Sequence, residues 1–337
     1  METLLYSAYG HVSALYTDLL SDKEIQLLSS VDSDHFLQVL SSTGYKQEIS
    51  RFYNFYKLPA LIDVVVTSHF INNCNKMLLI LPLFSKQIII NYLKKIDIQN
   101  IKLIIAAKMM NKQFDFVEGN LIIDRLSFNL SSPLMSMGDY MNLINQKNID
   151  EIVNYITRYG YSPLLSKERN FHSLSKRLDD QYFLRMVDSI KFFDGTEGPI
   201  IRFIRSLLDV RNIMYVMKAI ETGSSINVDD MVGGNLDIEK LVNSESISDL
   251  LKKIPFKLDS AFERYKSDGL LSNFENSMKS QLNNYYLSVF RQHVNSVGFL
   301  LSYILSAEIE RDKLRTMWFN KYYKLNKEEI NNLIYGV

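Results

Sequence analysis

Apolar residues recur at spacings of three and four along most of the chain, and glycine and proline rarely interrupt them. Such spacing places apolar side chains on one side of an α-helix. Two predicted faces are Leu178, Phe183, Met186, Val187 and Ile190, and Phe274, Met278, Leu282, Tyr285, Tyr286 and Val289. Alternating apolar and polar residues bounded by hairpin turns are scarce, so the sequence predicts an all-α fold.

Two strings recur at nearly the same spacing. FVEGNLIIDRL at 116–126 matches MVGGNLDIEKL at 231–241 in six of eleven positions, at an offset of 115. IDIQNI at 96–101 matches LDVRNI at 208–213, at an offset of 112. Repetition at one period indicates a chain built from similar structural units, and it is the most informative feature of this sequence.

Short strings that contain glycine give further information on the repeat and on turns. Gly44-Tyr45 and Gly160-Tyr161 recur at an offset of 116, although this match is shorter than the other two. Gly233-Gly234 predicts a turn that precedes a helix starting near Leu236.

A third, degenerate copy lies near the C-terminus, in EIERDKLR at 308–315. Its Glu310, Leu314 and Arg315 take the places of Asp97, Ile101 and Lys102. Lys313 replaces the asparagine of the other copies. Each acid follows a long predicted helical segment, at 61–92, 178–207 and 274–305.

The repeats divide the chain into three predicted helical units, 1–115, 116–230 and 231–337. One interface geometry could be reused between such units, which indicates an approximate threefold arrangement. A linear solenoid is the alternative. Units above 100 residues exceed the roughly 20 to 50 residues of common solenoid repeats, which favours three small domains.

Composition excludes several classes of protein. Lysine and arginine number 38, against 38 aspartate and glutamate, so the basic excess of a nucleic-acid-binding protein is missing. The single cysteine, Cys74, excludes an internal disulfide framework and favours a reducing cytosol. No secretory signal is recognisable, and the longest apolar run, residues 77–84, is far shorter than the roughly 20 residues of a membrane span.

Common catalytic and ligand-binding motifs are missing from the sequence, including Walker A, GxGxxG, HExxH and GxSxG. His172 with Asp179 and Asp180 fits no metal-ligand spacing, and DGTEGP at 194–199 is more typical of a loop than of a cation site. The basic-aromatic runs at 51–57 and 317–324 could stack nucleobases, but aromatic packing between helices is favoured. We predict no catalytic residue, cofactor or metal.

The repeated acids are the candidate site. The set comprises Asp97, Asn100, Lys102, Asp209, Arg211, Asn212, Glu310 and Arg315. On a helix, Asp97 shares a face with Ile101 and Ile104, one turn from Asn100. A structural pin that orients a helix is the favoured interpretation, and a direct partner contact or an unrecognised enzyme site is an alternative. A buried carboxylate needs a hydrogen bond or a cation, so we expect each acid to have one.

These motifs resemble the central-stalk component of the rotary ATPases. The resemblance lies in DIQNIK, LDDQYF, LDVRNI, the GNL turns and YILSAEIERDKLR, and it extends over about residues 6–334. That family comprises the C subunit of archaeal and bacterial ATPases of the vacuolar type and the d subunit of eukaryotic ones. The chain departs from the family pattern at His11 and Ser13, where arginines are common.

The resemblance implies a funnel of three similar helical domains around a pseudo-threefold axis. Such a protein is peripheral to the membrane, caps the cytoplasmic face of the proteolipid ring and receives the central shaft. It would transmit torque between proton or sodium flow and ATP turnover, as a monomer within a larger complex and without binding nucleotide. The alternative is a helical scaffold that binds another partner in its funnel.

Overall fold

The fold is all-α, as the sequence predicts. The computed structural model describes residues 2–112, 121–122, 135–161, 169–190, 198–228, 231–254, 259–293 and 296–324. Throughout these ranges the regular structure is helical, and no strand is present. The helices pack into two compact units, the first made of Met1–Ser189 with Ala307–Trp318, and the second of Ile190–Ser306 with Phe319–Val337. The predicted division into three repeats and the funnel stay predictions.

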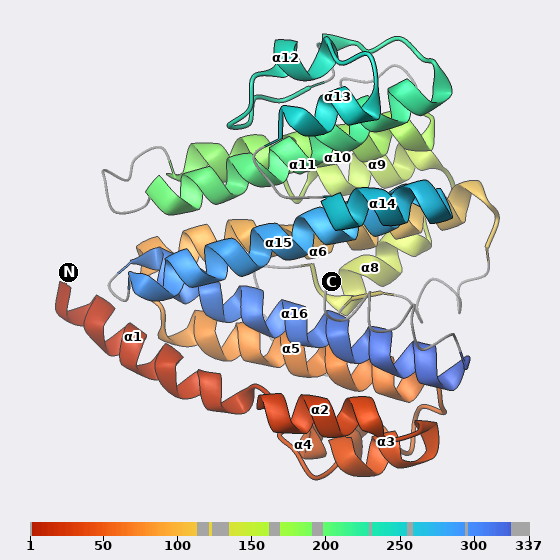
Figure 1. Ribbon diagram of the computed structural model, residues 1–337. Helices are drawn as coiled ribbons and strands as arrows, with labels where there is room; N and C mark the ends of the chain where they lie inside the picture. Colours follow the sequence, from red (N-terminus) through yellow and green to blue (C-terminus); the bar gives the residue numbers. More distant parts are fainter. Residues whose placement is uncertain are drawn as a thin grey trace. The chain divides into compact units, whose positions relative to one another are not determined.

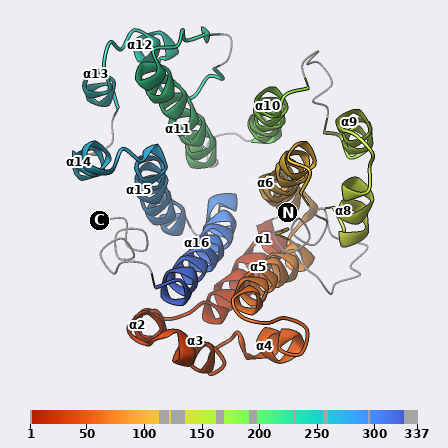
Figure 2. The same cartoon turned by 90° about the vertical axis from the view of Figure 1, so that its right-hand side faces the viewer.

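The first unit contains most of the helices (Figure 1). In chain order they are α1 (Glu2–Leu15), the 3₁₀ turn η1 (Tyr16–Asp18), α2 (Asp22–Ser30), α3 (Ser33–Leu40), α4 (Lys46–Phe52), α5 (Ala60–Ile80), α6 (Leu83–Met109), α8 (Met137–Ile144), α9 (Ile149–Thr157) and α10 (Phe171–Ile190). The middle of α16 (Val297–Tyr322) also belongs to it. Short helices accompany long ones: α4 packs on α5, and α8 and α9 pack beside α6 (Figure 2).

The second unit repeats this combination of long and short helices. Its helices are α11 (Gly198–Thr222), α12 (Ile238–Val242), α13 (Ile247–Lys252), α14 (Asp259–Asp268), α15 (Leu271–Gln292) and the two ends of α16. The short α12 and α13 pack on the long α11, and α15 packs on both α11 and α14.

Side-chain caps fix where the short helices begin. Ser21 caps α2 in a reciprocal arrangement with Glu24, and Ser136 caps α8 in the same way with Asp139. Asp237 caps α12. Each cap satisfies an amide that the first helical turn leaves without a partner. Ser21 and Ser136 lie 115 residues apart, which is the spacing of the repeated strings.

Each long predicted helical segment is in fact two helices. Residues 61–92 divide between α5 and α6 at Leu81 and Pro82, where proline lacks the amide hydrogen that helix continuation requires. Residues 274–305 divide between α15 and α16, where Ser296 caps the second helix. Residues 178–207 divide between α10 and α11, and 191–197 lie outside the described residues.

The predicted apolar faces are correct in outline. The buried residues of α10 are Leu174, Leu178, Tyr182, Met186 and Ile190, and those of α15 are Phe274, Met278, Leu282, Tyr286 and Phe290. Both sets follow a spacing of four, so residues one position away turn outward. Tyr285, which the sequence placed in the apolar face, is 60% exposed.

Charged side chains connect α5, α6 and α16 in the first unit. The Nζ of Lys95 lies 2.6 Å from Oε2 of Glu308, and the hydroxyl of Tyr92 donates to the same oxygen at 3.0 Å. Burial alone raises the pKa of Glu308, but Lys95 and Arg311 outweigh burial and hold that pKa below its usual value. The guanidinium of Arg311 also lies over the ring of Phe70 on α5, 4.7 Å from its centroid.

The basic-aromatic runs pack between helices only in part, since four of their eight aromatic side chains are exposed. Trp318 is fully buried, and its Nε1 donates to the carbonyl of Pro59 at 2.9 Å. Phe52 is buried as well, but Phe55 and Tyr323 are 78% and 59% exposed. No helix within the described residues is long and apolar enough to cross a membrane.

We expect Lys95→Met to lower the free energy of unfolding by about 3 kcal/mol, because it leaves the largely buried Glu308 without its cation. Lys76→Met is the matched control, since Lys76 pairs with Asp18 at an exposed position. Its loss should cost less than about 1 kcal/mol. Urea denaturation of both variants provides the measurement, and equal losses would contradict the assigned role of Glu308.

Candidate functional site

The carboxylate of Asp97 on α6 accepts hydrogen bonds from two other segments. Its Oδ1 accepts from the hydroxyl of Tyr140 at 2.5 Å and from the amide of Met135 at 3.1 Å. Its Oδ2 accepts from the hydroxyl of Tyr161 at 2.7 Å. Asp97 therefore connects α6 to Tyr140 in α8, to Met135 just before α8 and to Tyr161 after α9. We use the term acid clasp for a buried carboxylate on a long helix that accepts hydrogen bonds from other segments of the chain.

Burial changes the acidity of this group. Removal from water raises the pKa of Asp97 to about 6, although the hydrogen bonds from Tyr140, Tyr161 and Met135 act in the opposite direction. One turn further on, Asn100 binds the main chain of Ile122 twice, with both hydrogen bonds at 2.8 Å. Asn100 therefore holds a second stretch of chain against α6, beside the one that Asp97 holds.

Glu310 on α16 forms the second clasp of the first unit. Its Oε1 accepts from the hydroxyl of Tyr45 at 2.7 Å, and its Oε2 accepts from the amide of Leu20 at 2.7 Å. Burial raises the pKa of Glu310, and the Tyr45 hydrogen bond opposes that rise. The donors match those of Asp97: Tyr45 and Tyr161 come from the two Gly-Tyr pairs, and Leu20 precedes the cap of α2 as Met135 precedes that of α8.

Asp209 on α11 forms the clasp of the second unit. It accepts from the amides of Asn235 at 3.1 Å and Leu236 at 3.0 Å, just before the cap of α12. Burial raises its pKa. A Cβ on Gly234 would lie 1.9 Å from Oδ1 of Asp209, so only glycine fits there. The side-chain amide of Asn212 donates to the carbonyl of Val232 at 2.9 Å, as Asn100 does to Ile122.

The GNL strings do not have equivalent contacts in the two units. Leu236 of the second string supplies an amide to Asp209, whereas the amide that binds Asp97 belongs to Met135. Met135 lies 14 residues beyond Leu121, the counterpart of Leu236 in the first string. Sequence similarity alone therefore did not identify this donor, and it also missed Tyr140, which lies in no repeated string.

Two cations of the predicted set, Lys102 and Arg315, make separate ion pairs. Lys102 contacts Asp179 on α10 at 2.5 Å, and Arg315 pairs with Asp63 on α5. Arg211 is half-buried on α11. Each acid binds its own donors, so the three do not share one set of ligands. This geometry supports the structural-pin interpretation of the repeated acids.

The candidate metal ligands are not gathered. His172 is exposed, and Asp179 binds Lys102. Within the part of the chain that the structure describes, no cluster of three histidine, cysteine, aspartate or glutamate side chains could hold a metal ion. The loop predicted at 194–199 lies outside the described residues except for its last two positions.

Comparison with known proteins gives a match over nearly the whole chain. The model of the ATP synthase (C/AC39) subunit family matches residues 8–333. Proteins named as the C subunit of the A-type ATP synthase, from Thermoplasma volcanium and Thermoplasma acidophilum, are 28% and 26% identical, with 99% of each chain covered. The protein of that name from Archaeoglobus fulgidus is 24% identical, with 98% of each chain covered.

The tyrosine donors should contribute measurably to stability. We expect Tyr161→Phe and Tyr45→Phe each to lower the free energy of unfolding by about 2 kcal/mol, because each leaves a buried carboxylate oxygen without its donor. Tyr159→Phe is the control, since Tyr159 also donates to a carboxylate, that of Asp139, but at an exposed position. Denaturant titration should show a smaller loss for the control, and a comparable loss would argue against the clasps.

The raised pKa of Asp97 predicts a pH dependence with a definite sign. The folded state holds the proton of Asp97 more tightly than the unfolded state, so its contribution to stability is largest below the unfolded pKa and is lost as pH rises through about 6. The unfolding free energy of the parent protein minus that of Asp97→Asn should therefore fall by up to about 3 kcal/mol between pH 4 and 7.

Asp139→Asn provides a control of opposite sign. Hydrogen bonds from Tyr159 and Ser136 outweigh the effect of burial and lower the pKa of Asp139, so its contribution is lost as pH falls. Denaturation across the pH range measures both differences. A flat or rising difference for Asp97→Asn would contradict the burial argument.

Proposed function

The chain belongs to the ATP synthase (C/AC39) subunit family, and from this membership we propose that it is the rotor adaptor of a vacuolar- or archaeal-type ATPase or ATP synthase. In this role it links the central shaft to the membrane proteolipid ring on the cytoplasmic face. It transmits torque between proton or sodium flow and ATP turnover and is itself non-catalytic. The observation behind the proposal is the end-to-end match to relatives of the same length that are named as the C subunit of the A-type ATP synthase.

The acid clasps suit a part that works under load. Each fixes a long helix to short helices through hydrogen bonds to a buried carboxylate, and such bonds are costly to break in a low-dielectric interior. The ion pair between Lys95 and Glu308 adds a charged contact between α6 and α16. These contacts resist relative movement of the helices inside each unit, which a torque adaptor requires.

An exposed apolar surface supports the proposal that the chain binds a protein partner. The apolar tip, which we define as Leu79, Ile80, Pro82 and Leu83, lies where α5 turns into α6. Leu79 is 71% exposed and Leu83 is 84% exposed. Large apolar side chains gathered in this way on a protein surface are typical of protein interfaces. We assign the tip to contact with the proteolipid ring or the shaft.

Co-purification tests the complex directly. The tagged chain should recover proteolipid and central-shaft proteins from gently detergent-solubilised membranes of its own cells, as identified by mass spectrometry. Recovery of the chain with neither partner would refute the adaptor role and favour a helical scaffold for some other protein.

The apolar tip should be needed for this assembly. We expect the double substitution Leu79→Ser with Leu83→Ser to reduce recovery of one partner by about fivefold or more, because a buried leucine contributes about 1.5 to 3 kcal/mol. Leu27→Ser with Leu184→Ser is the matched control, since these leucines are also exposed, at 49% and 53%, but lie elsewhere.

The partner that is lost identifies what the tip contacts. Loss of proteolipid with the shaft retained assigns the tip to the ring, and the reverse assigns it to the shaft. Unchanged recovery of both would exclude the tip from either contact.

A further inference from the structure

The aromatic loop, which we define as residues 51–58, turns several large apolar side chains toward solvent at the end of α4. Tyr53 is 60% exposed, Phe55 is 78% exposed and Leu58 is 40% exposed. Packing between helices accounts for Phe52, which is buried, but not for these three. Large apolar side chains that gather on a surface indicate a place of contact.

The backbone of the aromatic loop is fastened at both ends. The amides of Phe55 and Tyr56 both donate to the carbonyl of the buried Phe52, at 2.9 Å and 3.1 Å. Just beyond the loop, the indole of Trp318 donates to the carbonyl of Pro59 at 2.9 Å. The exposed side chains are therefore held outward before any partner binds. Such pre-organisation reduces the entropy that binding costs.

The charged side chains exposed around the loop are all positive. Lys46, Arg51 and Lys57 are exposed, and among the described residues none of them has a carboxylate within ion-pair distance. Between residues 42 and 62 the one acid is Glu48, which is buried. The loop therefore combines exposed apolar side chains with positive charge.

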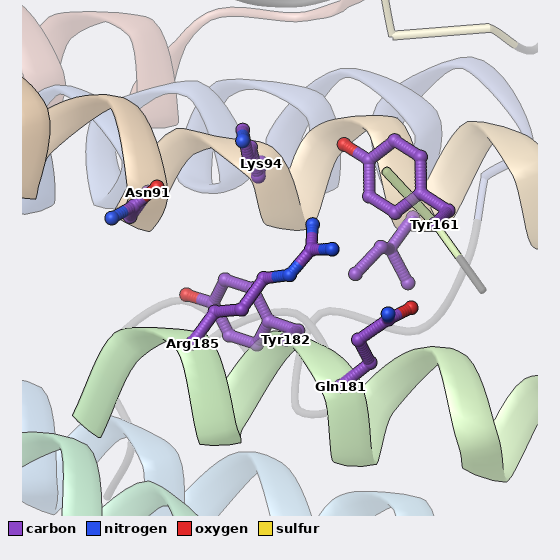
Figure 3. Close-up of a pocket in the computed structure, with 7 residues that line it drawn as sticks. Asn91, Lys94, Tyr161, Gln181, Tyr182 and Arg185 are labelled. Atoms are coloured by element: carbon purple, nitrogen blue, oxygen red, sulfur yellow. The ribbon is translucent and has the colours of Figure 1, made fainter. Parts of the chain in front are cut away.

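Residues 167–174 correspond to the aromatic loop, because both sequences and contacts on either side of them match at an offset of 116. Tyr45 and Tyr161 each donate to a buried acid. Asp63 and Asp179 each pair with a cation. Figure 3 shows Tyr161 beside the side chains of α10.

The described part of the corresponding stretch lacks these surface features. Leu174, the counterpart of Leu58, is fully buried. Arg169 is neutralised by Asp150, at 2.6 Å between Nε and Oδ1. The exposed leucine and the unpaired cations of the aromatic loop are therefore not requirements of the fold that the two stretches share.

This combination of side chains fits an anionic lipid surface. Aromatic rings and leucine enter the boundary between headgroups and acyl chains, and lysine and arginine are attracted to anionic headgroups. The core of a protein interface also accepts tyrosine and arginine, but lysine is depleted there. Two of the three cations, Lys46 and Lys57, are lysines, which favours lipid over protein.

We propose that the aromatic loop contacts an anionic lipid surface. Phe55 and Leu58 enter the headgroup region, and Lys46, Arg51 and Lys57 lie against the phosphate groups of the lipids. The contact is reversible, because a few apolar side chains and cations bind a membrane far less strongly than a spanning helix does. The proposal is independent of the adaptor role.

Co-sedimentation of the full-length chain with lipid vesicles tests this contact. Vesicles of phosphatidylcholine mixed with phosphatidylglycerol should carry the chain into the pellet, and vesicles of phosphatidylcholine alone should carry down much less of it. Added sodium chloride should weaken the binding, because salt screens exposed charges. Equal binding to both kinds of vesicle, or binding to neither, would overturn the proposal.

The exposed ring should contribute to the binding. Phe55→Ser should weaken binding to the anionic vesicles by about tenfold, because it removes an apolar side chain from the lipid. Phe171→Ser is the matched control, since Phe171 holds the corresponding position and is 41% exposed, and it should bind as the parent does. A comparable loss in the control would overturn the assignment to the loop.

The cations should contribute as well. Arg51→Gln with Lys57→Gln should weaken binding by about tenfold or more, because each cation near an anionic surface contributes about fivefold. Lys218→Gln with Lys252→Gln makes the same change of charge at exposed positions of the second unit and should leave binding unchanged. Equal losses in the two double variants would reduce the effect to net charge and overturn the proposal.

Two further measurements separate lipid binding from misfolding and from nucleic-acid binding. Circular dichroism should give folded spectra for all variants. Phe55→Trp should keep the binding, and its fluorescence should shift to shorter wavelength with anionic vesicles, because the native Trp318 is already buried. A labelled single-stranded oligonucleotide should not bind. Oligonucleotide binding that depends on Phe55, without vesicle binding, would overturn the proposal and favour a base-stacking surface.

Discussion

A buried carboxylate on a long helix is the constraint on which this structure depends. Ionised groups lose their hydration on burial, so a helix that carries one cannot pack unless donors are delivered to it. Asp97 and Glu310 obtain those donors from a tyrosine hydroxyl and a main-chain amide of another segment. Asp209 obtains its donors from two amides ahead of a short helix. In each case the acid specifies which segment lies against the helix.

The clasps also connect parts of the chain that are far apart in sequence. Glu310 accepts from Leu20, 290 residues away, so the C-terminal helix α16 and the N-terminal short helices of the first unit are held by one side chain. Lys95 with Glu308, and Trp318 with Pro59, strengthen the same association. A protein proposed to transmit torque gains rigidity from such long-range contacts, because local unfolding at one end requires breaking buried bonds at the other.

The Glu310 and Asp97 clasps have similar hydrogen bonds but different charged residues around them. Beside the Glu310 clasp, His69 lies against Gly44 and next to Glu48, whereas beside the Asp97 clasp Arg185 lies against Gly160. Hydrogen bonds to the acid hold the framework in both, so charges around it can change without loss of the fold.

Sequence alone determined the all-α fold, the family and the positions of the three acids, because helical periodicity and repeated strings are local properties of the chain. It also marked Tyr45 and Tyr161 through their Gly-Tyr pairs, although not what they bind. Only the tertiary structure decided which residues donate hydrogen bonds to each acid and which side chains lie close to one another. Tyr140 and Met135 lie in no repeated string, and Lys94 and Arg185 meet only because α6 and α10 pack together. Contacts between distant segments depend on how helices approach one another, and periodicity within a helix does not encode that approach.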